Sequence, residues 1–216
     1  MTPIEQILFL LKAVPVTLGI SLASFVLGFA IGIPIALLRI YGGRFTSMAA
    51  DAYEKVFRSI PVLVVMFFMY FGLGSVIHLF KDPYITSVLS LGLVSAANQS
   101  QIFRSAMGSV GRTQMMAAMS IGLTKAGAVR YVIIPQAFIV AIPGLGSEIA
   151  LLIKDSSYSF LIGVLELMKH ASILRAATRS AVIPYIASAF IYVALTFPFA
   201  NYMDRWGTRK RRELGL

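Results

Sequence analysis

Long uncharged stretches are the feature of this sequence that most restricts its fold. A helix needs about 20 apolar residues to cross the ~30 Å hydrocarbon core of a membrane. Apart from Glu148 in the fourth, five stretches of this length carry no charge, and they predict spans over residues 14–38, 60–80, 84–103, 131–153 and 181–203. Because a signal peptide has an apolar region of only about 7 to 15 residues, we expect the first stretch to be retained.

The composition agrees with a membrane protein. Of the 216 residues, 58% are hydrophobic and only 13% are charged, whereas soluble domains carry roughly 25% charged residues. Cysteine is absent, which excludes disulfides, thiolate nucleophiles and cysteine-based metal sites. The net charge is +10, but the basic run 209–212 directly follows the last stretch, which is typical of an anchor at anionic lipid headgroups. We therefore predict no nucleic-acid partner.

The basic residues are unevenly distributed between the connections. Thirteen of the 19 Lys and Arg fall in 39–58, 104–130 and the tail after 203. Because cytoplasmic loops carry the excess of basic residues, the N-terminus is predicted outside and the C-terminus inside. The connection 154–179 is basic although it is placed outside. Its apolar residues recur at helical spacing and predict a short helix folded against the bundle: Phe160, Leu161, Val164, Leu165 and Met168.

The fourth stretch contains residues that interrupt helices. Pro143 removes a backbone donor, and Gly144 and Gly146 add flexibility, so we expect a broken helix here. Glu148 follows at once. A charged side chain near the centre of a span costs on the order of 3 kcal/mol, which makes Glu148 a candidate functional residue. The alternative is that Glu148 pairs with Arg or Lys for packing alone.

The third stretch ends in a polar cluster, Asn98-Gln99-Ser100-Gln101, followed by Arg104. Asn98 and Gln101 are three positions apart and share a helix face. Such a stripe serves either to hold neighbouring helices together or to contact a substrate, and the sequence leaves both open.

The connection 104–130 carries an apolar stripe of its own: Met115, Met119, Leu123, Ala126 and Val129. Gly122 and Gly127 are expected to divide it into two short helices. The stripe suits either a membrane surface or a cytoplasmic partner. No phosphate-binding G-x-x-x-x-G-K-[ST], nucleophile elbow or H-E-x-x-H pair occurs, so the chain is not predicted to be an enzyme. Nucleotide chemistry, if used, must come from another polypeptide; an ion gradient is the other source of energy.

The same connection carries a family resemblance. Met116-Ala117-Ala118, Gly122 and Val132–Pro135 stand at the spacings of the Glu-Ala-Ala signature of ABC importer permeases for polar amino acids, and Gln114 fits the residue before it. The chain is similar to the histidine, glutamine, arginine and glutamate type. Further stretches resemble the family in the same order: Arg58–Pro61, Phe67–Leu73, Leu152–Ser157 and Ile162–Leu167.

The resemblance implies an all-α membrane protein with five transmembrane helices and the type I ABC importer permease (MetI-like) architecture, in a bacterial or archaeal cytoplasmic membrane. It also implies ATP-driven import of a polar amino acid by alternating access. The implied partners are ABC ATPase subunits that bind ATP and Mg²⁺, an extracytoplasmic amino-acid-binding protein and a second permease subunit, identical or not. The alternative from another class is a membrane scaffold that recruits a cytoplasmic partner without transport.

The resemblance also assigns candidate residues. Those expected to couple to the ATPase are Gln114, Met116, Ala117, Ala118, Gly122 and Pro135. Those expected along the substrate path are Glu148 first, then Asn98 and Gln101, with Arg104 and Asp155 as outer candidates. Two departures matter. Met116 replaces the acidic residue of Glu-Ala-Ala, so docking there must be apolar, and residues 98–101 replace a frequent Tyr-x-x-Glu, which predicts a different cargo.

Overall fold

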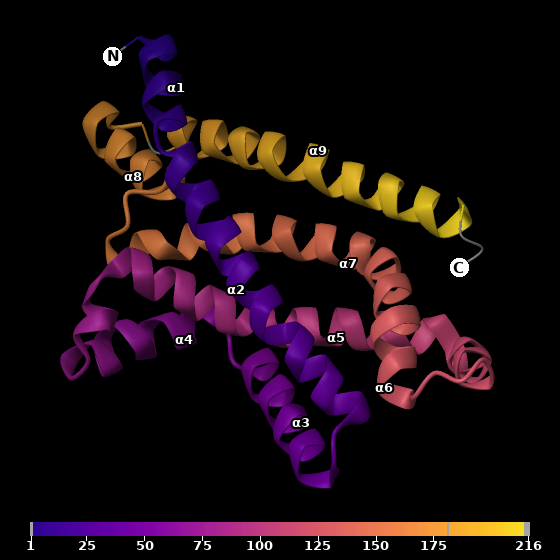
Figure 1. The fold of residues 1–216 in the computed structure, drawn as a ribbon. Helices are drawn as coiled ribbons and strands as arrows, with labels where there is room; N and C mark the ends of the chain where they lie inside the picture. The colour runs from indigo at the N-terminus through magenta and orange to yellow at the C-terminus, as the bar shows by residue number, and fades with distance from the viewer. Residues whose placement is uncertain (1, 181, 214–216) are drawn as a thin grey trace.

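The computed structural model describes residues 2–180 and 182–213, and within these ranges it contains helices and turns but no strand. Position 181, where the fifth predicted span begins, lies outside them. Four helices are long: α2 (Val14–Tyr41), α5 (Pro83–Ser120), α7 (Ile134–Asp155) and α9 (Ile183–Glu213). In Figure 1, α5, α7 and α9 run side by side and α2 crosses them obliquely. The all-α prediction is confirmed.

Close packing of α2 on α5 depends on two glycines one turn apart. Gly28 and Gly32 form a G-x-x-x-G pair, a pattern that lets helices in membranes approach closely. A Cβ at Gly32 would lie 2.7 Å from the Ala96 carbonyl oxygen, and one at Gly28 would lie 2.7 Å from Nε2 of Gln99. The same amide donates to the Phe25 carbonyl at 3.0 Å. The contact therefore combines small residues with a polar bond between the helices.

An aromatic cluster joins the three inner helices. Phe29 of α2, Phe103 of α5 and Phe138 of α7 have ring centroids 5.2 to 5.7 Å apart. Tilted and edge-on contacts at this separation are favourable beyond the area that the rings bury. Around them lie small and aliphatic side chains, including buried Ala106, Ala137 and Ala141. The core thus sits where α2, α5 and α7 cross.

The second predicted span, 60–80, is not one continuous α-helix. Helix α3 (Arg44–Ser59) ends before Pro61, α4 (Val62–Phe67) follows, and the segment Val62–Ser75 that α4 begins runs at 98° to α3. A residue before proline avoids the helical region, and Ile60 has φ −91° and ψ 128°. A π-helical turn at Phe68–Gly72 and 3₁₀ turns at Leu73–Ser75 and His78–Lys81 complete the segment.

The predicted break in the fourth stretch is also wrong, because α7 is continuous through Pro143. Its two glycines serve packing instead. A Cβ at Gly146 would lie 2.5 Å from Cβ of Met203 on α9, and one at Gly207 of α9 would lie 2.7 Å from the Pro143 ring. Pro143 deprives only the Ile139 carbonyl of its donor. The glycine and proline positions therefore bring α7 and α9 together rather than ending α7.

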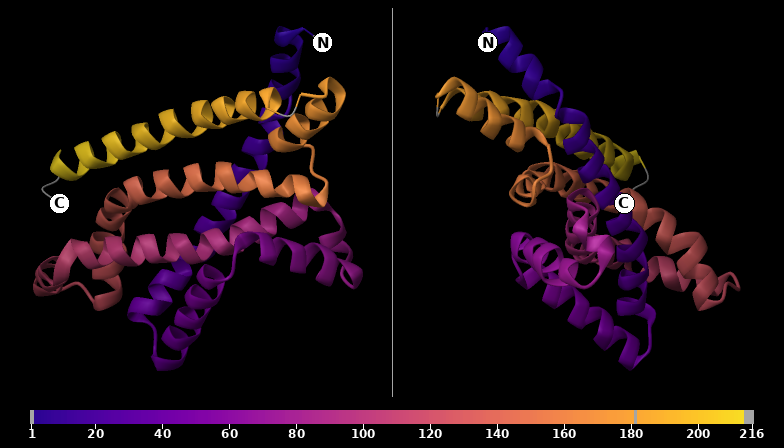
Figure 2. Two further views of the ribbon diagram at one scale, coloured as in Figure 1. Left: turned by 180° about the vertical axis from the view of Figure 1, so that it is seen from behind. Right: turned by 90° about the vertical axis from the view of Figure 1, so that its left-hand side faces the viewer.

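Helices α1 (Pro3–Leu11) and α8 (Leu167–Thr178) form the opposite end of the molecule from α6 (Lys125–Ala128) and the C-terminus (Figures 1 and 2). The helix predicted around 160–168 is displaced. A 3₁₀ segment covers Ser156–Ile162, Gly163 takes φ +103°, and α8 starts only at Leu167. Left-handed backbone ends helical turns, so the apolar spacing there was misleading.

Buried Glu166 fixes the start of α8. Its carboxylate accepts from the Lys169 backbone N–H at 2.7 Å and from the Tyr192 hydroxyl of α9 at 2.9 Å. The Leu167 N–H donates to the Thr17 hydroxyl of α2 at 3.1 Å. Burial raises the pKa of Glu166 to about 7. One carboxylate therefore ties α8 to α9, next to a bond that ties α8 to α2.

Length and apolarity allow three described helical stretches to cross a membrane: Ile4–Tyr41, Lys125–Ile162 and Ile183–Glu213. A fourth is added if the bent pair of α3 with the segment from Val62 to Ser75 counts as one span. Helix α5 does not pass the same test because polar side chains interrupt it, and many of them face the bundle, including buried Ser87, Ser90 and Ser95. The number of five spans stays a prediction.

Candidate functional site

A cavity of about 600 Å³ lies between α5 and α7, bordered by the end of α3 and by Arg211 near the end of α9. Its polar lining combines one carboxylate, two guanidinium groups, two amides and two hydroxyls: Glu148, Arg58, Arg211, Asn98, Gln101, Ser105 and Ser109. Apolar side chains of both helices fill the rest of the wall. A concave, mostly apolar site with a few polar groups is what a small-molecule pocket requires.

Glu148 is the carboxylate of this cavity and is 6% exposed. The Asn98 amide donates to its Oε1 at 3.4 Å. None of the ion pairs among the described residues includes Glu148. The described residues therefore give no support to the alternative that Glu148 pairs with Arg or Lys for packing alone. A buried carboxylate without a cation is costly to maintain and is suited to binding a cationic group.

The polar cluster of α5 divides between the two roles that the sequence left open. Asn98 and Gln101 line the cavity, and Oε1 of Gln101 is buried without a hydrogen-bond partner. Gln99 and Ser100 instead bond to neighbouring helices, at the Phe25 carbonyl and at Glu54. An unpaired buried acceptor costs about 1 to 3 kcal/mol. The face of Asn98 and Gln101 therefore offers an acceptor to a ligand, and the other face holds the bundle together.

Arg104 does not line the cavity. Its Nη2 lies 3.2 Å from Oε2 of Glu54, whose Oε1 accepts from the Ser100 hydroxyl at 2.6 Å. Glu54 is 4% exposed and holds α3 against α5. Asp155, the other outer candidate, lies two turns beyond Glu148 at the end of α7 and also outside the cavity lining. The structure therefore brings together three of the five path candidates.

Three functional candidates escaped sequence reasoning: Arg58, Arg211 and Glu54. Arg58 is the last basic residue before the Pro61 break, and this bend places it at the cavity. Arg211 belongs to a basic run that the sequence assigned to lipid contact alone. Glu54 gave no local signal in the sequence, because its partners Ser100 and Arg104 lie 46 and 50 positions away.

The predicted coupling residues lie at one end of the molecule. Helix α5 continues to Ser120, so the first half of the connection 104–130 is helical rather than a loop. Gly122 then takes φ +90°, and α6 (Lys125–Ala128) and a π-helical turn (Val129–Ile133) lead into α7. Gly127, where a second break was expected, lies inside α6.

The end of α5 and the turn that follows it form an exposed apolar tip. Met116 is 61% exposed and Ile121 80%, and Gln114, Ala117 and Pro135 are exposed as well. Ala118 is buried. A Cβ at Gly122 would meet nothing within 4 Å in this chain. The left-handed backbone, rather than crowding within the chain, is therefore the local reason for glycine there.

A long helix with polar side chains, a cavity at its middle and an exposed tip at its end is more than a plain membrane anchor requires. The model for the binding-protein-dependent transport system inner membrane component matches residues 14–212. The chain belongs to this family and is an amino acid ABC importer permease, a multi-pass protein of the inner membrane.

Characterised relatives agree. A nopaline transport system permease of Agrobacterium fabrum is 34% identical over 203 residues, covering 90% of this chain and 84% of the relative. An L-cystine transport system permease of Bacillus subtilis is 33% identical over 191 residues, covering 86% and 80%. An arginine transport system permease of the same organism is 32% identical over 192 residues, covering 89% and 88%. These relatives are permease subunits and give no support to the scaffold alternative.

Solved structures share the fold. One described as an amino acid ABC transporter with histidines matches with a TM-score of 0.86 at 30% identity, covering 95% of this chain and 96% of the other. An inward-facing structure of the MetNI methionine ABC transporter has a TM-score of 0.84 at 18% identity, covering 97% and 99%. The type I permease architecture is thereby confirmed.

Proposed function

We propose that this subunit carries a polar amino acid, or a derivative of one, through the cavity between α5 and α7 by alternating access. The observation that supports this most directly is a cavity with opposite charges: Glu148 faces it from α7 and Arg58 from the end of α3. An amino acid is a zwitterion. Glu148 is suited to its α-ammonium group and Arg58 to its α-carboxylate, with Asn98 and Gln101 as further hydrogen-bonding groups.

The proposed power source lies outside this chain. We infer that two ATPase subunits, which bind ATP and Mg²⁺, serve a pair of permease subunits, and that one of them docks on the exposed tip of this chain, formed by Met116, Met119 and Ile121. A binding protein would deliver the cargo on the opposite side, and a second permease subunit would complete the path. Helix α5 supports this coupling, because its 38 residues form one continuous helix, about 57 Å long, that lines the cavity near its middle and ends at the tip.

Reconstitution tests the proposal. The complex of this subunit with its ATPase and binding protein is placed in liposomes. The liposomes are expected to take up a labelled polar amino acid only when ATP is supplied on the side of the membrane where the ATPase lies. Glu148→Gln should weaken uptake, while basal ATP hydrolysis in the absence of cargo stays near the wild-type rate. ATP-dependent uptake that is unaffected by Glu148→Gln would exclude Glu148 from the path.

A further inference from the structure

The cavity between α5 and α7 has an excess of positive charge. Its lining holds two guanidinium groups, Arg58 and Arg211, against one carboxylate, Glu148. Neither guanidinium group takes part in an ion pair found for residues 2–180 and 182–213. A zwitterionic amino acid bound between Glu148 and Arg58 matches both of those charges. The charge of Arg211 then stays unmatched beside the cargo, which is unfavourable in a partly buried site.

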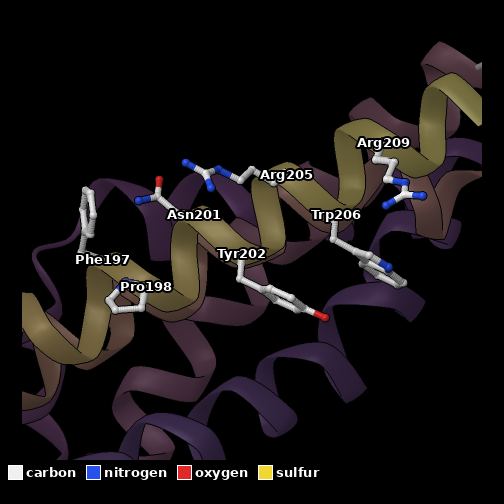
Figure 3. Close-up of a pocket in the computed structure, with 7 residues that line it drawn as sticks. All are labelled: Phe197, Pro198, Asn201, Tyr202, Arg205, Trp206 and Arg209. Carbon is white, nitrogen blue, oxygen red and sulfur yellow. The ribbon is translucent and has the colours of Figure 1, made fainter.

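Arg211 is the member of the basic run 209–212 that lines this cavity. Arg209 instead donates to Glu213 at 2.9 Å and lines a separate hollow of α9, drawn in Figure 3. A helix turns about 200° over two residues, so Arg211 lies on nearly the opposite face from Arg209. Arg212 lines another hollow, away from the cavity. Anchoring of a basic tail at the membrane surface therefore does not explain why Arg211 faces the cavity.

Contacts between α7 and α9 place Arg211 near the end of the cavity that is remote from Glu148. The two helices are antiparallel (Figure 1), and a Cβ at Gly207 would lie 2.7 Å from the Pro143 ring. Arg211 is one turn beyond Gly207, and thus near the level of Val140, which also lines the cavity. Val140 and Glu148 are eight positions apart, which is about 12 Å along a helix. Opposite charges at the two ends therefore suit an elongated cargo.

We propose that the cargo carries a second carboxylate, which binds Arg211 while the α-ammonium group binds Glu148. This inference rests on the proposed function and specifies its cargo as a dicarboxylic amino acid. Such a molecule has a single net negative charge, which complements the positive excess of the lining. Arginine also binds a carboxylate through two parallel hydrogen bonds, which a side-chain amide cannot match. A basic cargo would instead add a cation to a lining that is already positive.

Equilibrium binding tests the cargo class. The complex of the two permease subunits with the ATPase is placed in nanodiscs without the binding protein, whose own selectivity would otherwise contribute. Labelled glutamate is displaced by unlabelled glutamate or glutamine, which have the same shape and differ in side-chain charge. We expect glutamate to displace the label at an about tenfold lower concentration than glutamine. The preference of aspartate over asparagine should be smaller, because the shorter side chain ends further from Arg211.

Variants assign the preference to Arg211. Arg211→Gln should weaken glutamate binding about tenfold and leave glutamine binding unchanged. Arg211→Lys retains a cation and should keep part of the preference. Arg212→Gln is the matched control, because it removes the neighbouring charge outside the cavity, and it should keep the full preference. Thermal unfolding checks the fold of each variant, and the comparison of ligands in the wild-type complex needs no variant.

The outcomes separate this inference from the proposed function. Equal binding of glutamate and glutamine, or a preference that survives Arg211→Gln, would overturn the inference. If Glu148→Gln still weakens both ligands in that case, the path through the cavity stands with another cargo. If neither ligand binds, or if Glu148→Gln changes the binding of neither, the proposed path fails and the inference fails with it.

Discussion

At the scale of single residues, the polar cluster of α5 shows that both sequence spacing and the neighbouring helices decide what each side chain contacts. Asn98 and Gln99 are adjacent in sequence, yet one faces the cavity and the other the Phe25 carbonyl of α2. A helix turns about 100° per residue, so neighbours necessarily point to different partners. Spacing alone identified the pair that shares a face, and only the positions of α2 and α7 decided which face is the cavity.

Glu148→Gln tests the role of the cavity carboxylate. The substitution keeps the shape and removes the charge, so an ammonium group loses a charge-assisted bond of about 2 kcal/mol, or about 30-fold in apparent affinity. We expect KM for uptake to rise by that factor, measured in proteoliposomes. Ser147→Ala is the matched control, because Ser147 is exposed on the same helix and bonds only to the Pro143 carbonyl. An equal effect of both substitutions would contradict the assignment.

Glu54→Ala tests the buried ion pair between α3 and α5. Removing one partner leaves Arg104 without its acceptor, and a buried pair broken in this way costs about 3 kcal/mol. Arg104 is 39% exposed, so water lowers the cost, and we expect about 2 kcal/mol in thermal or chemical unfolding. The double variant Glu54→Ala, Arg104→Ala should recover part of the loss. Additive losses would show that the two side chains are not coupled.

At the scale of elements, the junction of α8 depends on a carboxylate that is paired with a hydroxyl and a backbone N–H. Because the pKa of Glu166 is raised to about 7 in the folded protein, above its ordinary value near 4.5, the folded state binds the proton more tightly. Stability from this group is therefore present at low pH and is lost as pH rises toward 7.

We expect the melting temperature of the wild-type protein to fall between pH 5 and pH 8. Glu166→Gln keeps a neutral acceptor for Tyr192 and Lys169, so its melting temperature should fall less over the same range. Differential scanning fluorimetry in detergent measures both slopes. Parallel slopes for the two proteins would rule out Glu166 as the titrating group.

The turn between α5 and α6 is the second element with a sharp prediction. Gly122→Trp adds strain at φ +90° and bulk at the exposed tip, so membrane insertion should persist while ATP-driven uptake is abolished. Gly122→Asn is the control, because Asn tolerates left-handed backbone, and it should retain most of the uptake. Loss of uptake in both variants at normal insertion would mean that the side chain of Asn is already too large for the partner.

At the scale of the whole molecule, the connection 104–130 and the basic tail lie at one end and α8 at the other (Figures 1 and 2). The chain has no cysteine, so single introduced thiols report sidedness without background. Ser120→Cys is expected to react with an impermeant maleimide only after cells are permeabilised. Thr2→Cys should react in intact cells. The reverse pattern would invert the predicted orientation.

The sequence by itself determined the class of the protein, because uncharged stretches of 20 or more residues are rare outside membrane-spanning helices. The uneven distribution of basic residues between the connections agrees with this class, because it arises during membrane insertion. The sequence also indicated Glu148, because a charge in such a stretch is costly. Only the tertiary structure showed that α7 continues through Pro143, that the chain bends by 98° between α3 and the segment starting at Val62, and that Arg58 reaches the cavity while Arg104 binds Glu54. These outcomes depend on contacts between helices far apart in the chain, which local spacing does not encode.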